Sequence, residues 1–174
     1  MTKTKTKTQK LALYGLFTAL ALILSYLEAQ IPAFFAVPGM KLGLTNVVVL
    51  TALYCMDAKS ALLINFLRIF LVSILFGNGM SLAYSLAGGI LSGFVMIALK
   101  KSGRFSLLTV SIAGGVAHNI GQILAAMALL ETRALGWYLL VLWFTGLLSG
   151  AVIGLIGGEL CRRLEHLLRK GNVT

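Results

Sequence analysis

An arginine lies in the middle of a long apolar stretch of this chain. Residues 62–79 read LLINFLRIFLVSILFGNG, with Arg68 near the centre and Asn65 one helical turn before it. At this spacing the two side chains share one face of a helix. A guanidinium offers paired N–H donors that suit a carboxylate or a carbonyl group. Because ionisable groups in apolar helices usually face a bundle interior or a wet cavity, this face predicts a ligand site.

A second set of polar residues follows a single helical stripe. Ser111, Gly115, His118, Asn119 and Gln122 fall at i, i+4, i+7, i+8 and i+11 of a segment otherwise rich in Ile, Leu, Ala and Met. This spacing places them together on the inward side of a helix. Hydrogen bonding between helices would by itself explain such a stripe. Its combination with an arginine on another helix favours a ligand cavity.

Groups for acid–base or metal chemistry are few. The chain has five acidic residues, all near the ends of apolar segments or in the tail, and Glu28 is the nearest candidate partner for Arg68. The sequence contains no paired-aspartate DDxxD motif for magnesium and diphosphate, no HExxH, no GxSxG and no P-loop. We therefore expect no catalytic residues, no metal and no cofactor.

The composition is that of an integral membrane protein. Of 174 residues, 59% are hydrophobic and only 11% are charged, against about 25% charged in soluble domains. The net charge of +10 would also suit nucleic acid, but the charges lie between apolar blocks and not along an aromatic-rich face. We expect the lipid bilayer as partner and no nucleic acid.

Six apolar segments are predicted to be transmembrane helices, because a helix satisfies its own backbone hydrogen bonds in lipid. Residues 1–10 form a basic cytoplasmic N-terminal segment, residues 11–161 the six-helix membrane domain, and residues 162–174 a basic cytoplasmic tail that can extend the last helix. The second segment is short for a full span. The expected spans are about 11–29, 43–56, 60–76, 80–99, 105–130 and 136–160.

Lysine and arginine are distributed unevenly over the two sides of this bundle. Apart from Arg68, twelve lie on the side of both termini and two, Lys41 and Arg133, lie on the other. We expect a multi-pass protein of the cell membrane, and in a bacterial cytoplasmic membrane the positive-inside rule makes both of its termini cytoplasmic. The twelve are Lys3, Lys5, Lys7, Lys10, Lys59, Lys100, Lys101, Arg104, Arg162, Arg163, Arg169 and Lys170.

The loop after the first span is long and apolar. Residues 29–46 read AQIPAFFAVPGMKLGLTN and contain both prolines of the chain. Connecting loops are usually short and polar, so we interpret residues 30–43 as a lid over an outward-facing pocket. Cys55 and Cys161 are far apart in sequence and lack CxxC spacing, which predicts two isolated thiols.

Several of these segments resemble a known family. The most specific pieces are KLGLTN at 41–46, LLINFLRI at 62–69 and YSLAGG at 84–89. They are similar to the family labelled "Gx transporter", also called heptaprenyl diphosphate synthase component I. The small six-helix architecture resembles the substrate-binding S components of energy-coupling factor (ECF) transporters.

The resemblance implies an all-α, S-component-like membrane bundle that captures a small molecule from the outer side. Its expected partners are a membrane coupling subunit and a pair of cytoplasmic ATPases. The molecule would be anionic or amphipathic, related to a vitamin or an isoprenoid. The alternative is a non-catalytic membrane component of heptaprenyl diphosphate or menaquinone synthesis.

Two groups of residues follow from this hypothesis. On the first helix, the small residues that would contact the coupling subunit are Ala12, Gly15 and Ala19. The expected substrate-binding residues are Arg68, Asn65, His118, Asn119, Gln122, Asn46 and Tyr84.

Overall fold

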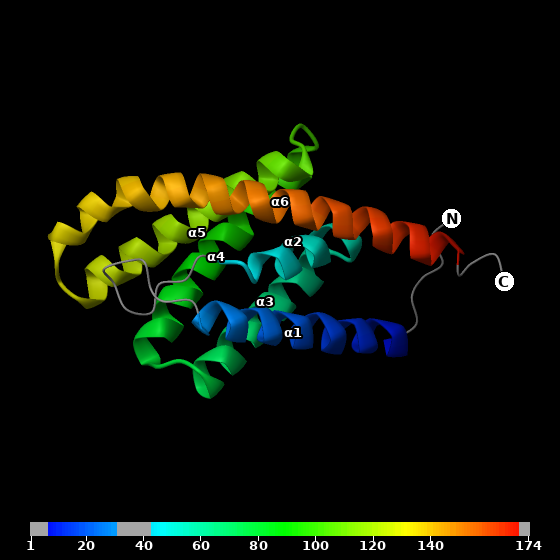
Figure 1. Cartoon of the computed structure of the whole chain (residues 1–174), viewed down its shortest axis with the longest axis horizontal. Helices are drawn as coiled ribbons and strands as arrows, with labels where there is room; N and C mark the ends of the chain where they lie inside the picture. The colour runs from blue at the N-terminus through cyan, green and yellow to red at the C-terminus, as the bar shows by residue number, and fades with distance from the viewer. Residues whose placement is uncertain (1–6, 31–42, 171–174) are drawn as a thin grey trace.

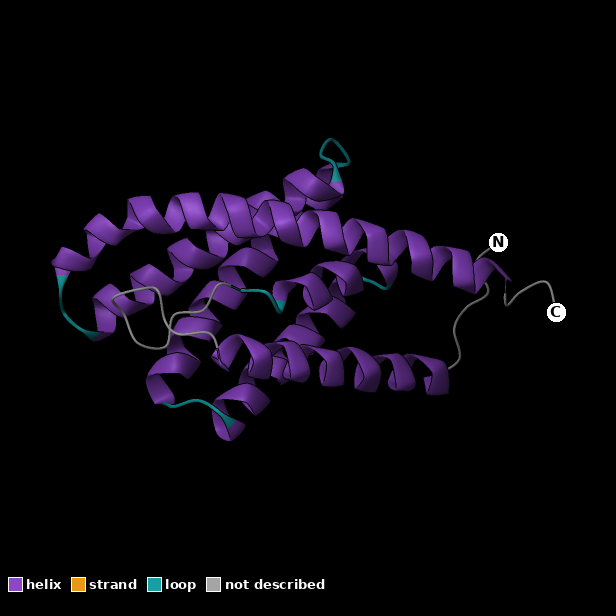
Figure 2. Cartoon of the chain, viewed as in Figure 1, coloured by secondary structure: helices purple, strands orange, loops and turns teal. Residues whose placement is uncertain are grey.

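The chain folds into an all-helical bundle (Figures 1 and 2). The structure is a computed structural model that describes residues 7–30 and 43–170, and these residues contain no strand. The 3₁₀-helix η1 (Arg133–Trp137) leads into the last helix. The six α-helices are α1 (Lys7–Gln30), α2 (Asn46–Cys55), α3 (Ala58–Leu75), α4 (Gly79–Ser102), α5 (Leu107–Leu129) and α6 (Tyr138–Lys170).

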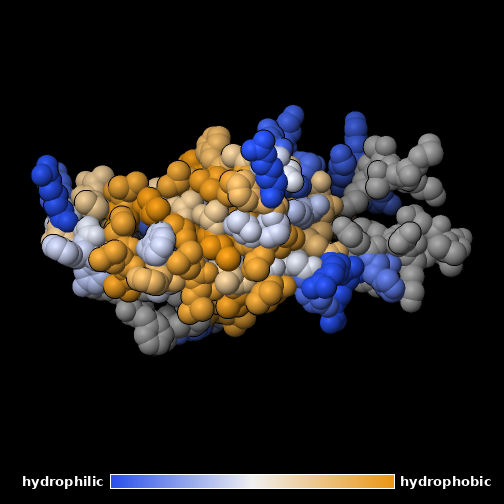
Figure 3. All heavy atoms as spheres, turned by 90° about the horizontal axis from the view of Figure 1, so that it is seen from above, coloured by the Kyte–Doolittle hydropathy of each residue, from blue (hydrophilic) through white to orange (hydrophobic). Residues whose placement is uncertain are grey.

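Five of these helices are long and apolar enough to cross a membrane, and α2, with ten residues, is shorter. The space-filling view shows apolar side chains over the middle of the molecule and hydrophilic ones gathered toward its ends (Figure 3). This distribution matches a bilayer, whose apolar core is about 30 Å thick. The predicted all-α membrane fold is confirmed. The short second segment is an almost wholly buried helix inside the bundle.

Local capping explains where three of the helices begin. Asp57, Asn78 and Ser106 each accept a hydrogen bond from the backbone N–H three residues later, as N-cap residues do. The bond from the Ser60 backbone N–H also holds the pKa of the Asp57 carboxyl below its usual value. The helix α4 ends at Gly103 with φ of +68°, a left-handed position that suits glycine.

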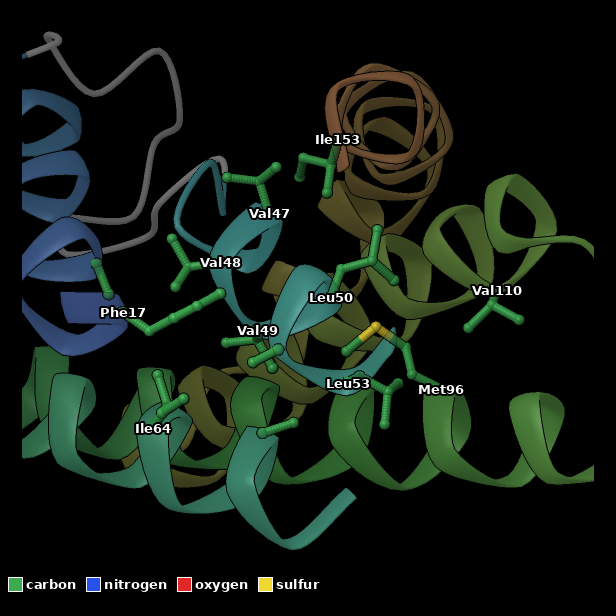
Figure 4. Close-up of a cluster of buried hydrophobic side chains, with 13 residues drawn as sticks. Phe17, Val47, Val48, Val49, Leu50, Leu53, Ile64, Met96, Val110 and Ile153 are labelled. Atoms are coloured by element: carbon green, nitrogen blue, oxygen red, sulfur yellow. The ribbon is translucent and has the colours of Figure 1, made fainter. Parts of the chain in front are cut away.

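The main apolar core surrounds α2 (Figure 4). Leu50 and Ile64 are completely buried there, and Met96 of α4 packs against the same cluster. Glycines let the neighbouring helices approach. A Cβ on Gly157 would lie 2.9 Å from Leu50 Cδ2, and one on Gly114 would lie 2.6 Å from Met96 Cγ. Helices in lipid associate through such close packing at small residues.

Several contacts join segments at one end of the bundle. The Tyr14 hydroxyl lies 2.9 Å from Ser60 Oγ, and Lys100 donates to the carbonyl of Leu53. The first turns of α1 and the last turns of α6 lie at this same end (Figure 1). The segments that carry the excess of lysine and arginine are therefore neighbours in space, as a common membrane side requires.

The prediction of two isolated thiols is wrong. Cys55, at the end of α2, and Cys161, in α6, lie with their sulfur atoms 3.1 Å apart. The two residues are 106 positions apart in the sequence, and only the packing of α2 against α6 brings them together.

Two other expectations concern chain segments at the edges of the bundle. The predicted lid, residues 30–43, lies outside the described residues except for Gln30 and Gly43. The last helix continues to Lys170, so most of the predicted basic tail extends α6.

Candidate functional site

Arg68 is the centre of a buried hydrogen-bond cluster. It lies on α3, and 7% of its surface is exposed. Its Nε and Nη2 atoms donate to Asn65 Oδ1 at 3.0 and 2.9 Å, and Nη2 also donates to Asn46 Oδ1 at 3.0 Å. Asn65 lies one turn before Arg68, as the sequence predicts, and Asn46 comes from the first turn of α2. Three of the seven predicted binding residues are thus in direct contact.

The orientation of Asn65 is fixed from a third helix. Its Nδ2 donates to the carbonyl of Gly89 at 3.2 Å, so that Oδ1 remains free to accept from Arg68. A Cβ on Gly89 would lie 2.7 Å from Ile69 Cδ1 and 3.0 Å from Asn65 Nδ2. Glycine at this position of YSLAGG lets α4 pack closely enough on α3 to make the bond.

Glu28 is buried beside this cluster. Only 5% of it is exposed. Its Oε1 accepts from the backbone N–H groups of Gly43 and Leu44, and its Oε2 accepts from the Thr45 hydroxyl at 3.4 Å. The carboxylate therefore holds the segment that leads into α2. It also attracts the Arg68 guanidinium electrostatically, although no ion pair within 4.0 Å joins the two among the described residues.

A small cavity separates the two charges. It has about 10 Å³ of room for the centre of a water molecule, close to the minimum that one water needs. The helices α1, α3, α4 and α5 contribute to its wall, together with Gly43 in the segment before α2. The described lining residues are Ser25, Glu28, Gly43, Arg68, Ile69, Val72, Ser85, His118 and Gln122.

Two residues of the α5 stripe reach this cavity with unpaired polar atoms. The amide Nε2 and Oε1 of Gln122 and the Nδ1 of His118 are buried and have no hydrogen-bond partner among the described residues. Gln122 is 1% exposed and His118 is 4% exposed. A buried polar group without a partner costs about 1–3 kcal/mol, so these atoms mark a place where a further polar group is missing.

Other polar residues of the stripe bind α6. Asn119 Nδ2 donates to the Leu142 carbonyl at 2.7 Å, and Ser111 Oγ donates to the Gly150 carbonyl at 2.7 Å. A Cβ on Gly115 would lie 2.5 Å from the Gly146 carbonyl oxygen, so that glycine serves close helix packing. The stripe therefore divides between the cavity and the contact with α6.

Tyr84 also lies away from the cavity wall. It is 1% exposed and packs in an apolar cluster with Ile123, Ala126 and Leu142. Of the predicted substrate-binding residues, Tyr84 and Asn119 are thus placed behind the cavity wall, whereas Arg68, His118 and Gln122 form part of it.

Sequence reasoning overlooked part of the cavity wall. The sequence indicates Glu28 only as a possible partner of Arg68, and it does not indicate that Ser25 and Ser85 line a cavity. Ser25 and Glu28 are three residues apart on α1, and this spacing places both side chains on one face of the helix. The Ser25 and Thr45 hydroxyl groups lie 2.9 Å apart, which joins this face of α1 to the start of α2.

The small residues predicted to contact a partner lie on the outer surface of α1. Ala12, Gly15 and Ala19 are all exposed. A Cβ on Gly15 would meet no atom within 4 Å. No other described part of the chain packs on Gly15, which leaves this stripe open to lipid or to another protein.

The cavity offers several groups that can bind a polar molecule. One fixed positive charge, one fixed negative charge, two hydroxyl groups, an imidazole and an amide surround it. Among residues 7–30 and 43–170, no three His, Cys, Asp or Glu side chains gather in a way that would hold a metal ion.

Comparisons with known proteins agree with this architecture. The model of the family described as heptaprenyl diphosphate synthase component I matches residues 17–160. A solved structure described as the S component of a bacterial ECF transporter is 19% identical in sequence. It matches with a TM-score of 0.73 over 94% of this chain and 99% of that one. This chain has the fold of that protein. No curated protein matches the chain.

Proposed function

This chain belongs to the heptaprenyl diphosphate synthase component I family, and we propose that it is the substrate-binding membrane subunit of an ECF-type uptake transporter. One observation carries the proposal. Buried polar atoms of Gln122 and His118 have no hydrogen-bond partner among the described residues. These two side chains line a cavity together with Arg68 and Glu28, inside a bundle with the fold of an S component. Such atoms are costly in a purely structural core, and a bound ligand would satisfy them.

In this function the ligand enters between the end of α1 and the first turns of α4. Arg68, held by Asn65 and Asn46, offers donors on one side of the cavity. His118 and Gln122 face it from α5, and Ser25 and Ser85 add hydroxyl groups. Asn119 and Tyr84 support this layer from behind, through the bond to α6 and the apolar cluster.

The charge distribution gives the proposed orientation. The ends of α1 and α6 that carry most lysines and arginines would face the cytoplasm. The cavity, which lies toward the opposite end of the bundle, would then open to the outside of the cytoplasmic membrane. Residues 1–10 and 162–174 would contact the cytoplasm and anionic lipid.

The open stripe on α1 is the proposed contact with the coupling subunit. Gly15→Leu adds a large side chain where the chain itself has no neighbour, so the thermal stability of the isolated protein should be unchanged or slightly higher. Close approach of a partner helix should be blocked, and co-purification of the coupling subunit should fall. Ala98→Leu, on an exposed position of α4, is the matched control and should leave the complex intact.

The family description supports a second candidate function, a non-catalytic membrane component of heptaprenyl diphosphate or menaquinone synthesis. The basic end of the bundle would then recruit a soluble prenyl synthase. The two functions differ in their partners, since one requires a coupling subunit with ATPases and the other a synthase.

Affinity purification from the native membrane, followed by native mass spectrometry, separates the two. The transporter function predicts ATPases, a membrane coupling subunit and a bound small molecule of stoichiometric amount. A soluble prenyl synthase in their place would contradict it and support the second candidate.

A further inference from the structure

The cavity beside Arg68 contains one charge of each sign. The Arg68 guanidinium and the Glu28 carboxylate both line it, and the other described lining residues carry no fixed charge. An anion in this space would be attracted by Arg68 and repelled by Glu28, and a cation would be repelled by Arg68 and attracted by Glu28. Burial strengthens both effects, because the effective dielectric is low away from water. The wall therefore suits a group without net charge.

The donors of Arg68 are already largely in use. Its Nε and Nη2 atoms are bonded to the amide oxygens of Asn65 and Asn46. A bidentate bond to a carboxylate needs two neighbouring N–H groups of the fork. A carboxylate bound in this bidentate way, through Nη2 and a neighbouring nitrogen, would have to displace an asparagine oxygen from Nη2. A single carbonyl oxygen needs only the remaining donors.

Gln122 offers what the ligand must complement. Its Nε2 and Oε1 are both unpaired and buried in the wall. They present a donor and an acceptor side by side, and a second amide presents the same pair in reverse. His118 adds an unpaired Nδ1 next to them. Ile69 and Val72 form an apolar part of the same wall. Because the cavity has room for about one water molecule, it admits the polar end of a ligand, and an attached ring or chain would extend out of it.

We propose that the recognised end of the ligand is an uncharged group with adjacent carbonyl and N–H functions, such as a primary amide, a lactam or a urea. Gln122 pairs with it on one side and Arg68 donates to its carbonyl on the other. This inference rests on the proposed function, since it names the ligand class of the same cavity. The proposed uncharged group differs from the anionic group expected from the sequence, because Glu28 lines the same cavity as Arg68.

Three probes of equal shape and different charge test the inference: benzamide, benzoate and protonated benzylamine. Binding to the purified full-length protein in detergent is measured by saturation-transfer NMR. Because one paired hydrogen bond is worth about 1 kcal/mol, benzamide should bind about fivefold more tightly than benzoate or benzylamine. Benzoate equal to or tighter than benzamide would overturn the proposal. Absence of binding by all three, up to their solubility limits, would also count against it.

Two substitutions make the test independent of folding. Glu28→Gln keeps an oxygen that can accept from the Gly43 and Leu44 N–H groups but removes the negative charge. Relative to benzamide, benzoate should then gain about tenfold or more. Gln122→Leu should remove the preference for benzamide. Ser111→Ala, on the same helix and also buried but bonded to the Gly150 carbonyl of α6, is the control; it should lower stability and leave the ranking of the probes unchanged.

The inference and the proposed function fail in different ways. An anionic molecule found by native mass spectrometry in the purified protein would overturn the uncharged ligand and leave the transporter function in place. Failure of the coupling subunit and ATPases to co-purify would contradict the transporter function without touching the ranking of the probes. A preference for benzoate in Glu28→Gln but not in the unsubstituted protein would support the inference directly.

Discussion

The two halves of this bundle are built from opposite kinds of side chain. In the half around α2, Leu50 of α2, Ile64 of α3 and Met96 of α4 pack into one apolar core (Figure 4). Glycines lie directly against Leu50 and Met96. In the other half, Arg68 and Glu28 are buried with amides and hydroxyl groups around a small cavity. Both halves contain fully buried residues. Among the described residues, however, the unpaired polar atoms of Gln122 and His118 line the cavity of the second half.

This difference assigns separate tasks to the two halves. Apolar contacts and close helix packing contribute stability wherever they occur. Unpaired buried amides reduce stability, and proteins commonly keep such groups where function needs them. The apolar half should therefore set how stable the protein is, and the polar half what it binds. Each substitution below tests whether the two properties can be separated.

Arg68→Met should have the largest effect. It removes three hydrogen bonds, takes the Arg68 donors away from Asn65 Oδ1 and Asn46 Oδ1, and removes the positive charge near the buried Glu28 carboxylate. Breaking a buried charged cluster in this way costs roughly 4 kcal/mol. We expect a marked fall in the thermal unfolding temperature in detergent, together with complete loss of the bound small molecule in native mass spectrometry. Retention of that molecule would remove Arg68 from the binding site.

Leu50→Ala should affect stability alone. Leu50 is fully buried in the apolar half, and truncation of a buried leucine costs about 3 kcal/mol. The folded fraction should still retain the small molecule in the same stoichiometry. The bound small molecule should be measured in Leu50→Ala and Arg68→Met at the same temperature. Loss of the molecule in both variants would mean that binding depends on overall stability.

The sequence was sufficient for the fold because the signal is local. Continuous apolar runs separated by charged or glycine-rich turns define the helices, and the i to i+3 relation of Asn65 and Arg68 holds within one helix. Capping residues such as Asp57 and Asn78 also mark helix starts within four positions of the chain.

The candidate site could be predicted only in part, because its other contacts join distant segments. The stripe on α5 correctly pointed inward, but periodicity does not say which neighbour each residue meets. His118 and Gln122 turn to the cavity, and Asn119 turns to α6. The burial of Glu28 depends on the turn at Gly43, whose φ is +83°. No spacing in the sequence shows that turn.

Gln122→Leu should raise stability and abolish binding. The two unpaired amide atoms of Gln122 are replaced by an apolar side chain of similar size, and relief of unsatisfied buried groups is worth about 2 kcal/mol. We expect a higher unfolding temperature for the ligand-free protein and no bound small molecule. If ligand-free Gln122→Leu unfolded at a lower temperature than the ligand-free unsubstituted protein, Gln122 would have a structural partner. The polar half would then also contribute to stability through this residue.

The smallest expected effect is a dependence on pH that is confined to the apolar half. Asp57 caps α3, and its pKa is below the ordinary 3.8 because the Ser60 N–H donates to it. A group with a lowered folded pKa contributes stability above its unfolded pKa and loses it as the pH falls through the folded value. Asp57→Ala should cost about 1 kcal/mol at neutral pH, and this difference from the unsubstituted protein should shrink toward zero below the folded pKa.

Asn78 provides the control, since it caps α4 with the same bond, from the Ser81 N–H at 2.8 Å, but has no charge to lose. Asn78→Ala should cost a similar amount at every pH. Unfolding temperatures of the three proteins, measured from about pH 7 down to about pH 3, separate the two caps. If the Asn78→Ala difference also fell with pH, the acid sensitivity would come from elsewhere in the bundle.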